Sequence, residues 1–292
     1  MKRKYPYPEG ESTVKLVSTD WLEEHYQDKN LMIVDTQPDI HDYITEHIQG
    51  AVYFNQKLLR IPKDGRPGVY NDKDVIQNLF RKVGLEKDVP AVVYTGTGDF
   101  RGWGDGLEQT MVAYTLARFG HDNVYVLDGG LDKWKKENKP LTKEFPTLEG
   151  SDFTVAVRKD YYVDMNEVKE MKDDDDVMLL DARPASMYEG QAIWIKPGHI
   201  PGAINLPWKD LMREDNPRLL KPEDELEKIL KDNGISKDKT LICSCGTGRE
   251  ATNEFILFKW YLKYPNVKIY EGSFTEWTAY PDNAVVTGPN PY

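Results

Sequence analysis

The chain has 292 residues, of which 39% are hydrophobic and 30% are charged, and its formal net charge is −11. This negative charge repels nucleic acid and anionic membrane surfaces, so we expect neither as a partner, and an anionic substrate would need local positive charge. The two cysteines, separated by one residue, and the five histidines fit neither a disulfide framework nor a zinc-ligand spacing, so we expect free thiols and no bound metal.

The N-terminal stretch MKRKYPYPEGEST has a basic start but no apolar run of signal-peptide length. No other segment approaches the length of a membrane span. The sequence therefore predicts a soluble, cytoplasmic protein, and a leader removed beforehand would leave no trace in it.

Four segments of the first half recur in the second half in the same order. The pairs are IVDTQP (33–38) with LLDARP (179–184), EHIQGAVYFN (46–55) with GHIPGAINLP (198–207), VGLEKDVPAVVYTGTG (83–98) with NGISKDKTLICSCGTG (233–248), and NVYVLDGGLDKW (123–134) with NVKIYEGSFTEW (266–277). Their offsets of 143 to 152 positions suit a duplicated domain better than solenoid repeats of about 20 to 50 residues. We expect the boundary within 138–153, which gives one domain over 1–145 and another over 146–292.

Short apolar runs alternate with helix-period stretches in both copies. Residues 71–84 and 221–234 place apolar side chains on one helical face and end in glycine. The runs VMLLD (177–181), TLICS (240–244) and NVKIY (266–270) are typical of parallel strands covered on both faces. Each copy is therefore predicted to be an α/β domain, with a mostly parallel sheet and helices on both faces.

Cys245 begins a glycine-rich loop between a predicted strand and a helix that starts near Glu250. Ligands of open α/β sheets bind at this edge. Gly246 and Gly248 allow the loop amides to converge on one negative atom, which would be the sulfur of Cys245. The helix N-terminus and the adjacent Arg249 add positive potential. We therefore predict an accessible thiol whose pKa is lowered from its usual value of about 8.5.

These motifs resemble the rhodanese family, in particular tandem-domain thiosulfate and 3-mercaptopyruvate sulfurtransferases. The similar segments are VSTDWLEEH (17–25), GHIPGAINLP (198–207), CGTG (245–248) and YEGSFTEW (270–277), in the order of the family. In that family only the C-terminal domain carries the catalytic cysteine. The sequence follows this division, because Thr95 stands opposite Cys245 in the ungapped match and its hydroxyl has no adjacent base to activate it.

The resemblance implies sulfur transfer by double displacement, without a cofactor. The Cys245 thiolate would take the outer sulfur of thiosulfate or 3-mercaptopyruvate as a persulfide, with release of sulfite or pyruvate. Cyanide, a small thiol or a thioredoxin-like protein would then accept the sulfur, with ping-pong kinetics. The expected donor-binding residues are Gly246, Thr247, Gly248, Arg249, Glu250, Arg183 and Ser273.

The second copy departs from the family pattern D-x-R-x-x-x-R after its first strand. Asp181 and Arg183 match this pattern, but Met187 stands in place of the last arginine. Arg249 is a candidate for the missing cation, so thiosulfate and 3-mercaptopyruvate both stay open as donors. Asp181 and Arg183 fit a structural ion pair as well as a role in the site.

Other conspicuous residues are expected to be structural. Cys243 fits a small core residue, with a redox role as the alternative. His47 and His199 occupy matching positions in both copies, including the one without a cysteine, so we expect structural roles. Trp134 and Trp277 are expected in the two cores.

Two further functions are weighed against sulfur transfer. A rhodanese-fold phosphatase would need the loop C-x5-R, but the position of that arginine is Ala251. A non-catalytic sulfur carrier or binding protein is the other alternative. The glycine-rich stretch 96–106, with Arg101 and Trp103, fits neither a dinucleotide fingerprint nor a P-loop.

Overall fold

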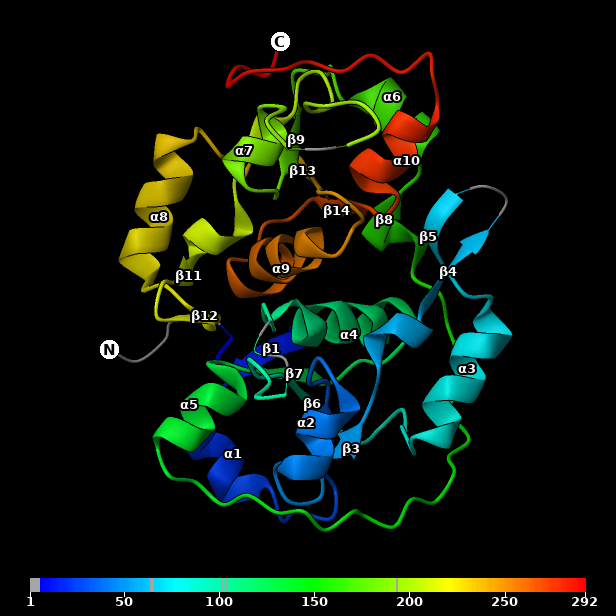
Figure 1. Ribbon diagram of the computed structural model, residues 1–292, viewed down its shortest axis with the longest axis vertical. Helices are drawn as coiled ribbons and strands as arrows, with labels where there is room; N and C mark the ends of the chain where they lie inside the picture. The colour runs from blue at the N-terminus through cyan, green and yellow to red at the C-terminus, as the bar shows by residue number, and fades with distance from the viewer. Residues whose placement is uncertain (1–5, 64–65, 101, 103, 193) are drawn as a thin grey trace. The chain divides into compact units, whose positions relative to one another are not determined.

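The computed structural model describes residues 6–63, 66–100, 102, 104–192 and 194–292, so Arg101 and Trp103 lie outside the described residues. The chain divides into two compact units (Figure 1). The first unit comprises Met1–Leu59, Asn71–Arg158 and Met212–Leu220, and the second comprises Arg60–Tyr70, Lys159–Leu211 and Lys221–Tyr292.

The first unit contains a five-stranded sheet of order β1-β7-β6-β2-β3, in which all neighbouring strands are parallel. Its strands are β1 (Val14–Val17), β2 (Met32–Asp35), β3 (Val52–Tyr53), β6 (Ala91–Tyr94) and β7 (Val124–Leu127). Its helices are α1 (Thr19–His25), α2 (Ile40–Thr45), η1 (Gln56–Leu58), α3 (Lys73–Lys82), α4 (Leu107–Arg118) and α5 (Gly130–Lys136).

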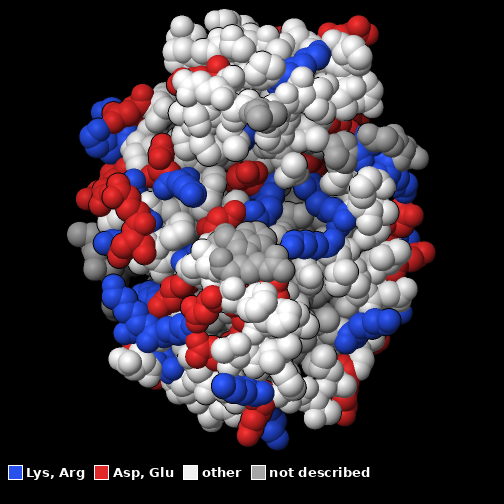
Figure 2. Space-filling view, in the orientation of Figure 1, with Lys and Arg blue, Asp and Glu red and all other residues white. Residues whose placement is uncertain are grey.

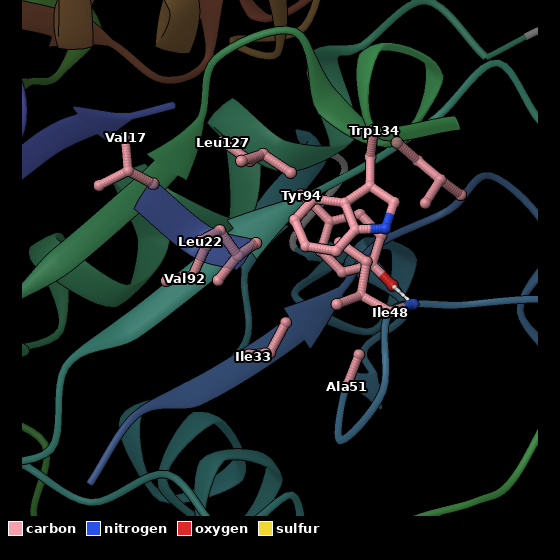
Figure 3. Packing of buried hydrophobic residues seen from close by; sticks show 10 residues of the cluster. Val17, Leu22, Ile33, Ile48, Ala51, Val92, Tyr94, Leu127 and Trp134 are labelled. Atoms are coloured by element: carbon pink, nitrogen blue, oxygen red, sulfur yellow. Dashed lines mark hydrogen bonds between the residues drawn. The ribbon is translucent and has the colours of Figure 1, made fainter. Parts of the chain in front are cut away.

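Both faces of this sheet are buried. On one face, Val92 of β6 packs with Leu22 of α1 and Trp134 of α5 (Figure 3). The neighbouring residues Ala91 and Val93 point to the opposite face, which α4 covers, and they are buried as well. Burial on both sides explains why the strand sequences are almost continuously apolar.

The second unit repeats this architecture with the parallel sheet β10-β9-β13-β14-β8. Its strands are β8 (Tyr162–Val163), β9 (Val177–Asp181), β10 (Ile204–Asn205), β13 (Thr240–Ser244) and β14 (Val267–Tyr270). Its helical segments are η2 (Lys159–Tyr161), α6 (Met165–Met171), α7 (Ala185–Tyr188), η3 (Trp208–Leu211), α8 (Glu223–Asp232), α9 (Glu250–Ile256), the π-helical turn η4 (Leu257–Tyr261) and α10 (Ser273–Ala279). The predicted α/β fold with two tandem domains is confirmed.

Each of two β-hairpins belongs to the unit that is formed mainly by the other half of the sequence. Strands β4 (Arg60–Lys63) and β5 (Arg66–Tyr70) pair antiparallel and belong to the second unit. Strands β11 (Met212–Arg213) and β12 (Asn216–Leu220) pair antiparallel and belong to the first. Each unit thus includes a hairpin from the other half of the sequence. The boundary after residue 145 stays a prediction of where the first repeat ends and the second begins.

The surface carries charge of both signs. On the face shown in Figure 2, basic side chains lie beside acidic ones, so local positive charge exists despite the net charge of −11. In the described part of the chain, the structure has no helix that is both long and apolar enough to span a membrane.

Candidate active site

Cys245 lies directly after β13, between that strand and α9. The backbone N–H of Gly248 donates to its Sγ, with the nitrogen 3.0 Å from the sulfur. The N–H groups of Ala251 and Thr247 also form hydrogen bonds to this sulfur. Three amides from the loop and the first turn of α9 therefore converge on one atom, as an amide cradle for negative sulfur would require.

The two loop glycines are required by the close packing of their neighbours. Gly248 has a φ of 77°, and a Cβ on it would lie 2.4 Å from the carbonyl oxygen of Glu271. A Cβ on Gly246 would lie 3.0 Å from Cη2 of Trp194, whose ring covers this part of the loop. Side chains at either position would displace the backbone that points its amides at the sulfur.

Ser273 fixes the backbone of Cys245. Its hydroxyl accepts a hydrogen bond from the N–H of Cys245 at 3.1 Å, donates to the carbonyl oxygen of Tyr270 at 2.8 Å and lies 3.9 Å from Sγ. Ser273 has a φ of 52°, a conformation that is costly for a residue with a side chain, whereas the first copy has Gly130 here with a φ of 60°. The second copy thus has a strained serine where the first copy has a glycine. Only the second copy has a cysteine whose backbone this hydroxyl can hold.

The thiol of Cys245 is less accessible and less acidic than the sequence predicted. Its side chain has no exposed surface. Burial, followed by the charge of Glu250 and its hydrogen bond, raises the thiol pKa well above its usual value, although the amides of Ala251 and Thr247 lower it. The prediction of an accessible, low-pKa thiol is therefore wrong for this conformation, because burial removes hydration of the thiolate that the amide donors do not replace.

Glu250 and Arg249 begin α9 and differ in their relation to the sulfur. The carboxylate of Glu250 accepts a hydrogen bond from the Cys245 thiol, so it can receive the thiol proton. Arg249 caps the helix and is half-buried, but it is not among the largest influences on the thiol pKa. The exposed residue of this loop is Thr247.

Arg183 lies beside the loop in a buried ion pair. Its Nη2 lies 2.6 Å from Oδ2 of Asp181 and 2.9 Å from the carbonyl oxygen of Gly198, and its guanidinium stacks 4.1 Å from the Phe274 ring centroid. A Cβ on Gly246 would lie 3.8 Å from Cδ of Arg183. Its Nη1 is buried without a hydrogen-bond partner among the described residues. The ion pair is thus formed, and one donor group stays available next to the loop.

Cys243 is a second free, buried thiol, located on β13. Burial, the charge of Glu254 and the neighbouring Cys245 raise its pKa well above the usual value. Glu254 of α9 is fully buried, and neither carboxylate oxygen has a hydrogen-bond partner among the described residues. No motif of the sequence points to this glutamate, although an acid directly before Phe255 and Ile256 in an apolar helix was a usable signal.

The two histidines make matching contacts in the two copies. The ring of His47 stacks on Tyr43 and its nitrogens contact the carbonyl oxygens of Tyr43 and Glu144, while His199 has the same relation to Tyr188 and Asn290. Both are buried, which agrees with structural roles.

The tryptophans Trp134 and Trp277 lie in the two cores, as the sequence predicted. Their ring nitrogens donate to the carbonyl oxygens of Pro140 and Ala284. In the described part of the chain, no three His, Cys, Asp or Glu side chains are grouped as metal ligands.

The equivalent loop of the first copy has its amides already bound. The N–H of Thr95 donates to Oε1 of Gln109 at 3.2 Å, and the N–H of Thr97 donates to Oδ2 of Asp132 at 3.1 Å. In the second copy Thr275 takes the place of Asp132 and donates to the carbonyl oxygen of Gly246 instead. The amide of Thr247 is therefore left to act on sulfur, whereas the equivalent amide of Thr97 is taken by Asp132; the amides of Thr95 and Cys245 are both bound by side chains.

The repeated fold and the cysteine loop agree with the comparisons to known proteins. A model of the rhodanese-like domain matches residues 18–137 and again residues 164–280. The chain belongs to the rhodanese family.

Two relatives show how far the likeness extends. A Synechococcus elongatus protein with the provisional name thiosulfate sulfurtransferase is 35% identical over 96% of this chain and 88% of its own length. The 3-mercaptopyruvate sulfurtransferase of Escherichia coli K12 is 32% identical over 93% of this chain and 97% of its own. The crystal structure of SseA from Escherichia coli, described as a 3-mercaptopyruvate enzyme, superposes with a TM-score of 0.78 at 30% identity, over 89% of this chain and 98% of that one. The chain thus belongs among the sulfurtransferases of this family.

Proposed function

We propose that this rhodanese transfers a sulfane sulfur through a persulfide on Cys245. The observation that carries the proposal is the convergence of the Gly248, Ala251 and Thr247 amides on Sγ, in the one copy that has a cysteine. Amides that face a single sulfur stabilise a thiolate and, after transfer, the terminal sulfur of a persulfide.

In the first step, Glu250 accepts the thiol proton and the Cys245 thiolate attacks the outer sulfur of the donor. With thiosulfate, the donor S–S bond breaks, its electron pair leaves with sulfite, and a Cys–S–S⁻ persulfide forms. With 3-mercaptopyruvate, the C–S bond breaks, and the resulting pyruvate enolate takes a proton, which Glu250 can return after accepting it from the thiol.

In the second step, the persulfide loses its outer sulfur to an acceptor nucleophile such as cyanide, a small thiol or a thioredoxin-like protein. The bond between the two sulfurs breaks and the electron pair returns to Cys245. The enzyme alternates between a free form, which reacts with the donor, and a persulfide form, which reacts with the acceptor, so parallel double-reciprocal plots are expected.

The donor's anionic end requires positive charge near the loop. Arg183 supports this role because its Nη1 has no partner among the described residues and its Cδ lies close to Gly246. Arg249 and the loop residues Thr247 and Gly248 complete the proposed donor site, with Ser273 as support for the cysteine backbone. Since the relatives include proteins named for each donor, kcat/KM for thiosulfate against 3-mercaptopyruvate is the measurement that assigns specificity.

A donor can reach Sγ only after a neighbouring side chain moves, because the side chain of Cys245 has no exposed surface. Trp194, packed over Gly246, is the neighbour whose displacement would open the loop. Two buried thiols in their reduced form also suit a reducing compartment such as the cytoplasm.

Sulfur carriage is a second candidate function. A Thermus thermophilus protein named sulfur carrier protein TtuD is 31% identical over 94% of this chain. A carrier would form the same persulfide and pass it to one protein partner, with slow turnover on small acceptors.

Intact-protein mass measurement tests the proposal. Incubation with thiosulfate or 3-mercaptopyruvate should add the mass of one sulfur, which cyanide should remove. Rapid multiple turnover with cyanide supports the transferase, whereas a stable adduct that turns over slowly favours the carrier. An unchanged mass with both donors would contradict both functions.

A further inference from the structure

Arg60 comes from the first half of the sequence but lies against the cysteine loop of the second unit. It begins β4, in the hairpin that belongs to the second unit. One guanidinium nitrogen, Nη1, donates to the carbonyl oxygen of Thr247, and the other, Nη2, donates to the carbonyl oxygen of Glu271 at 2.9 Å. The guanidinium also stacks on Tyr70 of β5, with 4.9 Å between Cζ and the ring centroid.

These two contacts connect the segments that surround Cys245. Thr247 belongs to the cysteine loop, and Glu271 lies two residues before Ser273, whose hydroxyl accepts the N–H of Cys245. The planar, forked guanidinium can span two carbonyl oxygens at once, which a single ammonium group does less well. Arg60 therefore ties together the two segments that hold the cysteine.

The contact with Thr247 also orients an amide that faces the sulfur. The carbonyl group of Thr247 and the N–H of Gly248 belong to the same peptide plane, and in a trans peptide they point in opposite directions. Because the carbonyl is held by Arg60, the N–H on the other side of the plane is held toward Sγ of Cys245, 3.0 Å from the nitrogen. Loss of the arginine would leave this peptide free to rotate.

The first unit contains a comparable contact that makes a useful control. Arg218 of β12, in the other hairpin, donates through Nη2 to Oγ1 of Thr97 at 2.9 Å, and its Nε lies 2.8 Å from Asp132. This arginine supports the loop that has no thiol. The two arginines stand at different positions of their hairpins, since Met212 begins β11 where Arg60 begins β4.

We propose that Arg60 is a positioning residue that fixes the Thr247–Gly248 peptide, so that the amide of Gly248 points at the sulfur of Cys245. The expected loss of kcat rests on the proposed function. The expected shift in the pH profile of Cys245 alkylation does not depend on any sulfur donor. It assigns to the first half of the chain a direct part in preparing the nucleophile.

The test measures thiolate formation in a Cys243→Ser background, from the pH profile of Cys245 alkylation by iodoacetamide. Arg60→Ala should move the midpoint upward, lower the alkylation rate at pH 7 about tenfold, and lower kcat more than it raises KM. Arg60→Lys keeps the charge without the fork and should recover less than half of the loss. If Arg60→Ala does not fold, the alkylation profile of Arg60→Lys is compared with that of the wild type instead.

Arg218→Ala is the matched control, because it removes an arginine from the other hairpin. It should lower the melting temperature without moving the alkylation profile. An unchanged profile in folded Arg60→Ala would overturn the proposal, as would complete recovery in Arg60→Lys, which would assign the effect to charge alone. If the wild type accepts sulfur from neither donor while Arg60→Ala still moves the profile, the proposed function fails and the role of Arg60 stands.

Discussion

Asp132 accepts hydrogen bonds from both the backbone N–H and the hydroxyl of Thr97 in the first rhodanese domain. The hydroxyl lies 2.8 Å from Oδ1, and the amide nitrogen lies 3.1 Å from Oδ2. The corresponding amide of the second domain, that of Thr247, binds the sulfur of Cys245. Asp132 therefore occupies the backbone N–H of Thr97, which a nucleophile in the first domain would need to stabilise its negative charge.

This relationship predicts that a thiol alone does not activate the first domain. Thr95→Cys in a Cys245→Ser background should take up no sulfur from thiosulfate or 3-mercaptopyruvate, because Gln109 and Asp132 still bind the loop amides. Intact mass after incubation is the measurement. The Cys245→Ser single variant is the control, and an added sulfur in the double variant would contradict the explanation.

The two cysteines should differ in their effect on transfer. Cys245→Ser should lower turnover by about 10³-fold or more, because serine lacks the thiolate on which the three amides act. Cys243→Ser should retain most activity, since this thiol lies beside Glu254 on the strand before the loop. Steady-state rates with cyanide as acceptor measure both, and comparable losses in two folded variants would show that the thiols act as a pair.

Ser273 should contribute to stability and activity in separable ways. Ser273→Ala keeps the strained backbone and leaves the buried N–H of Cys245 without its acceptor, so it should lower the free energy of unfolding by about 1–3 kcal/mol. Ser273→Gly relieves the strain, as Gly130 does in the first domain, and should cost less. Both should lower kcat/KM. Urea unfolding together with kinetics tests this, and equal stability of the two variants would contradict the role of backbone strain.

Glu254 should make the protein less stable as the pH rises. Burial, followed by the charges of Asp181 and Glu250, raises its pKa well above the ordinary value of 4.5. The folded chain therefore keeps a proton that the unfolded chain releases above pH 4.5, so the free energy of unfolding falls from that pH upward.

Glu254→Met removes this proton and introduces the residue found at the same place in the first domain, because Met111 is the fifth residue of α4 as Glu254 is the fifth residue of α9. The variant should gain about 2 kcal/mol at pH 7 and lose the corresponding part of the pH dependence. Asp35, whose pKa is raised to about 6 by burial, should still contribute a decline up to that pH in both proteins. Urea unfolding between pH 5 and 8 is the measurement, and parallel stability curves would exclude a protonated Glu254.

Trp194 should control access to the thiol. Its ring packs over Gly246, so Trp194→Ala should speed alkylation of Cys245 at a pH where the thiol is ionised. The matched control is Trp208→Ala, which removes a buried tryptophan elsewhere in the second unit. An alkylation rate that does not change in Trp194→Ala would show that other side chains cover the sulfur.

The repeated fold was predictable because local patterns determine it. The run TLICS became β13, the run VMLLD became β9, and the stretch 221–234 contains α8, with Gly234 in the left-handed conformation just beyond the helix. Strand alternation and helix caps involve neighbours within a few residues, which a single sequence displays directly.

Parts of the site were not predictable, because they depend on contacts between distant residues. Arg60 reaches Thr247 across 187 positions, and nothing in the sequence around the arginine indicates that partner. The burial of Cys245, and with it the upward shift of its thiol pKa, depends on packing that motif spacing does not report. The strain at Ser273 could have been suspected from its alignment with Gly130, since glycine marks a left-handed position.

The division of the hairpins bears on how this protein can be cut or recombined. A fragment that starts at residue 146 would lack Arg60–Tyr70, and a fragment that ends at residue 145 would lack Met212–Leu220. Neither fragment would carry all the segments of one compact unit, so the duplicated halves have become mutually dependent. An exchange of domains with another member of the family would therefore need to transfer each hairpin together with the body into which it folds.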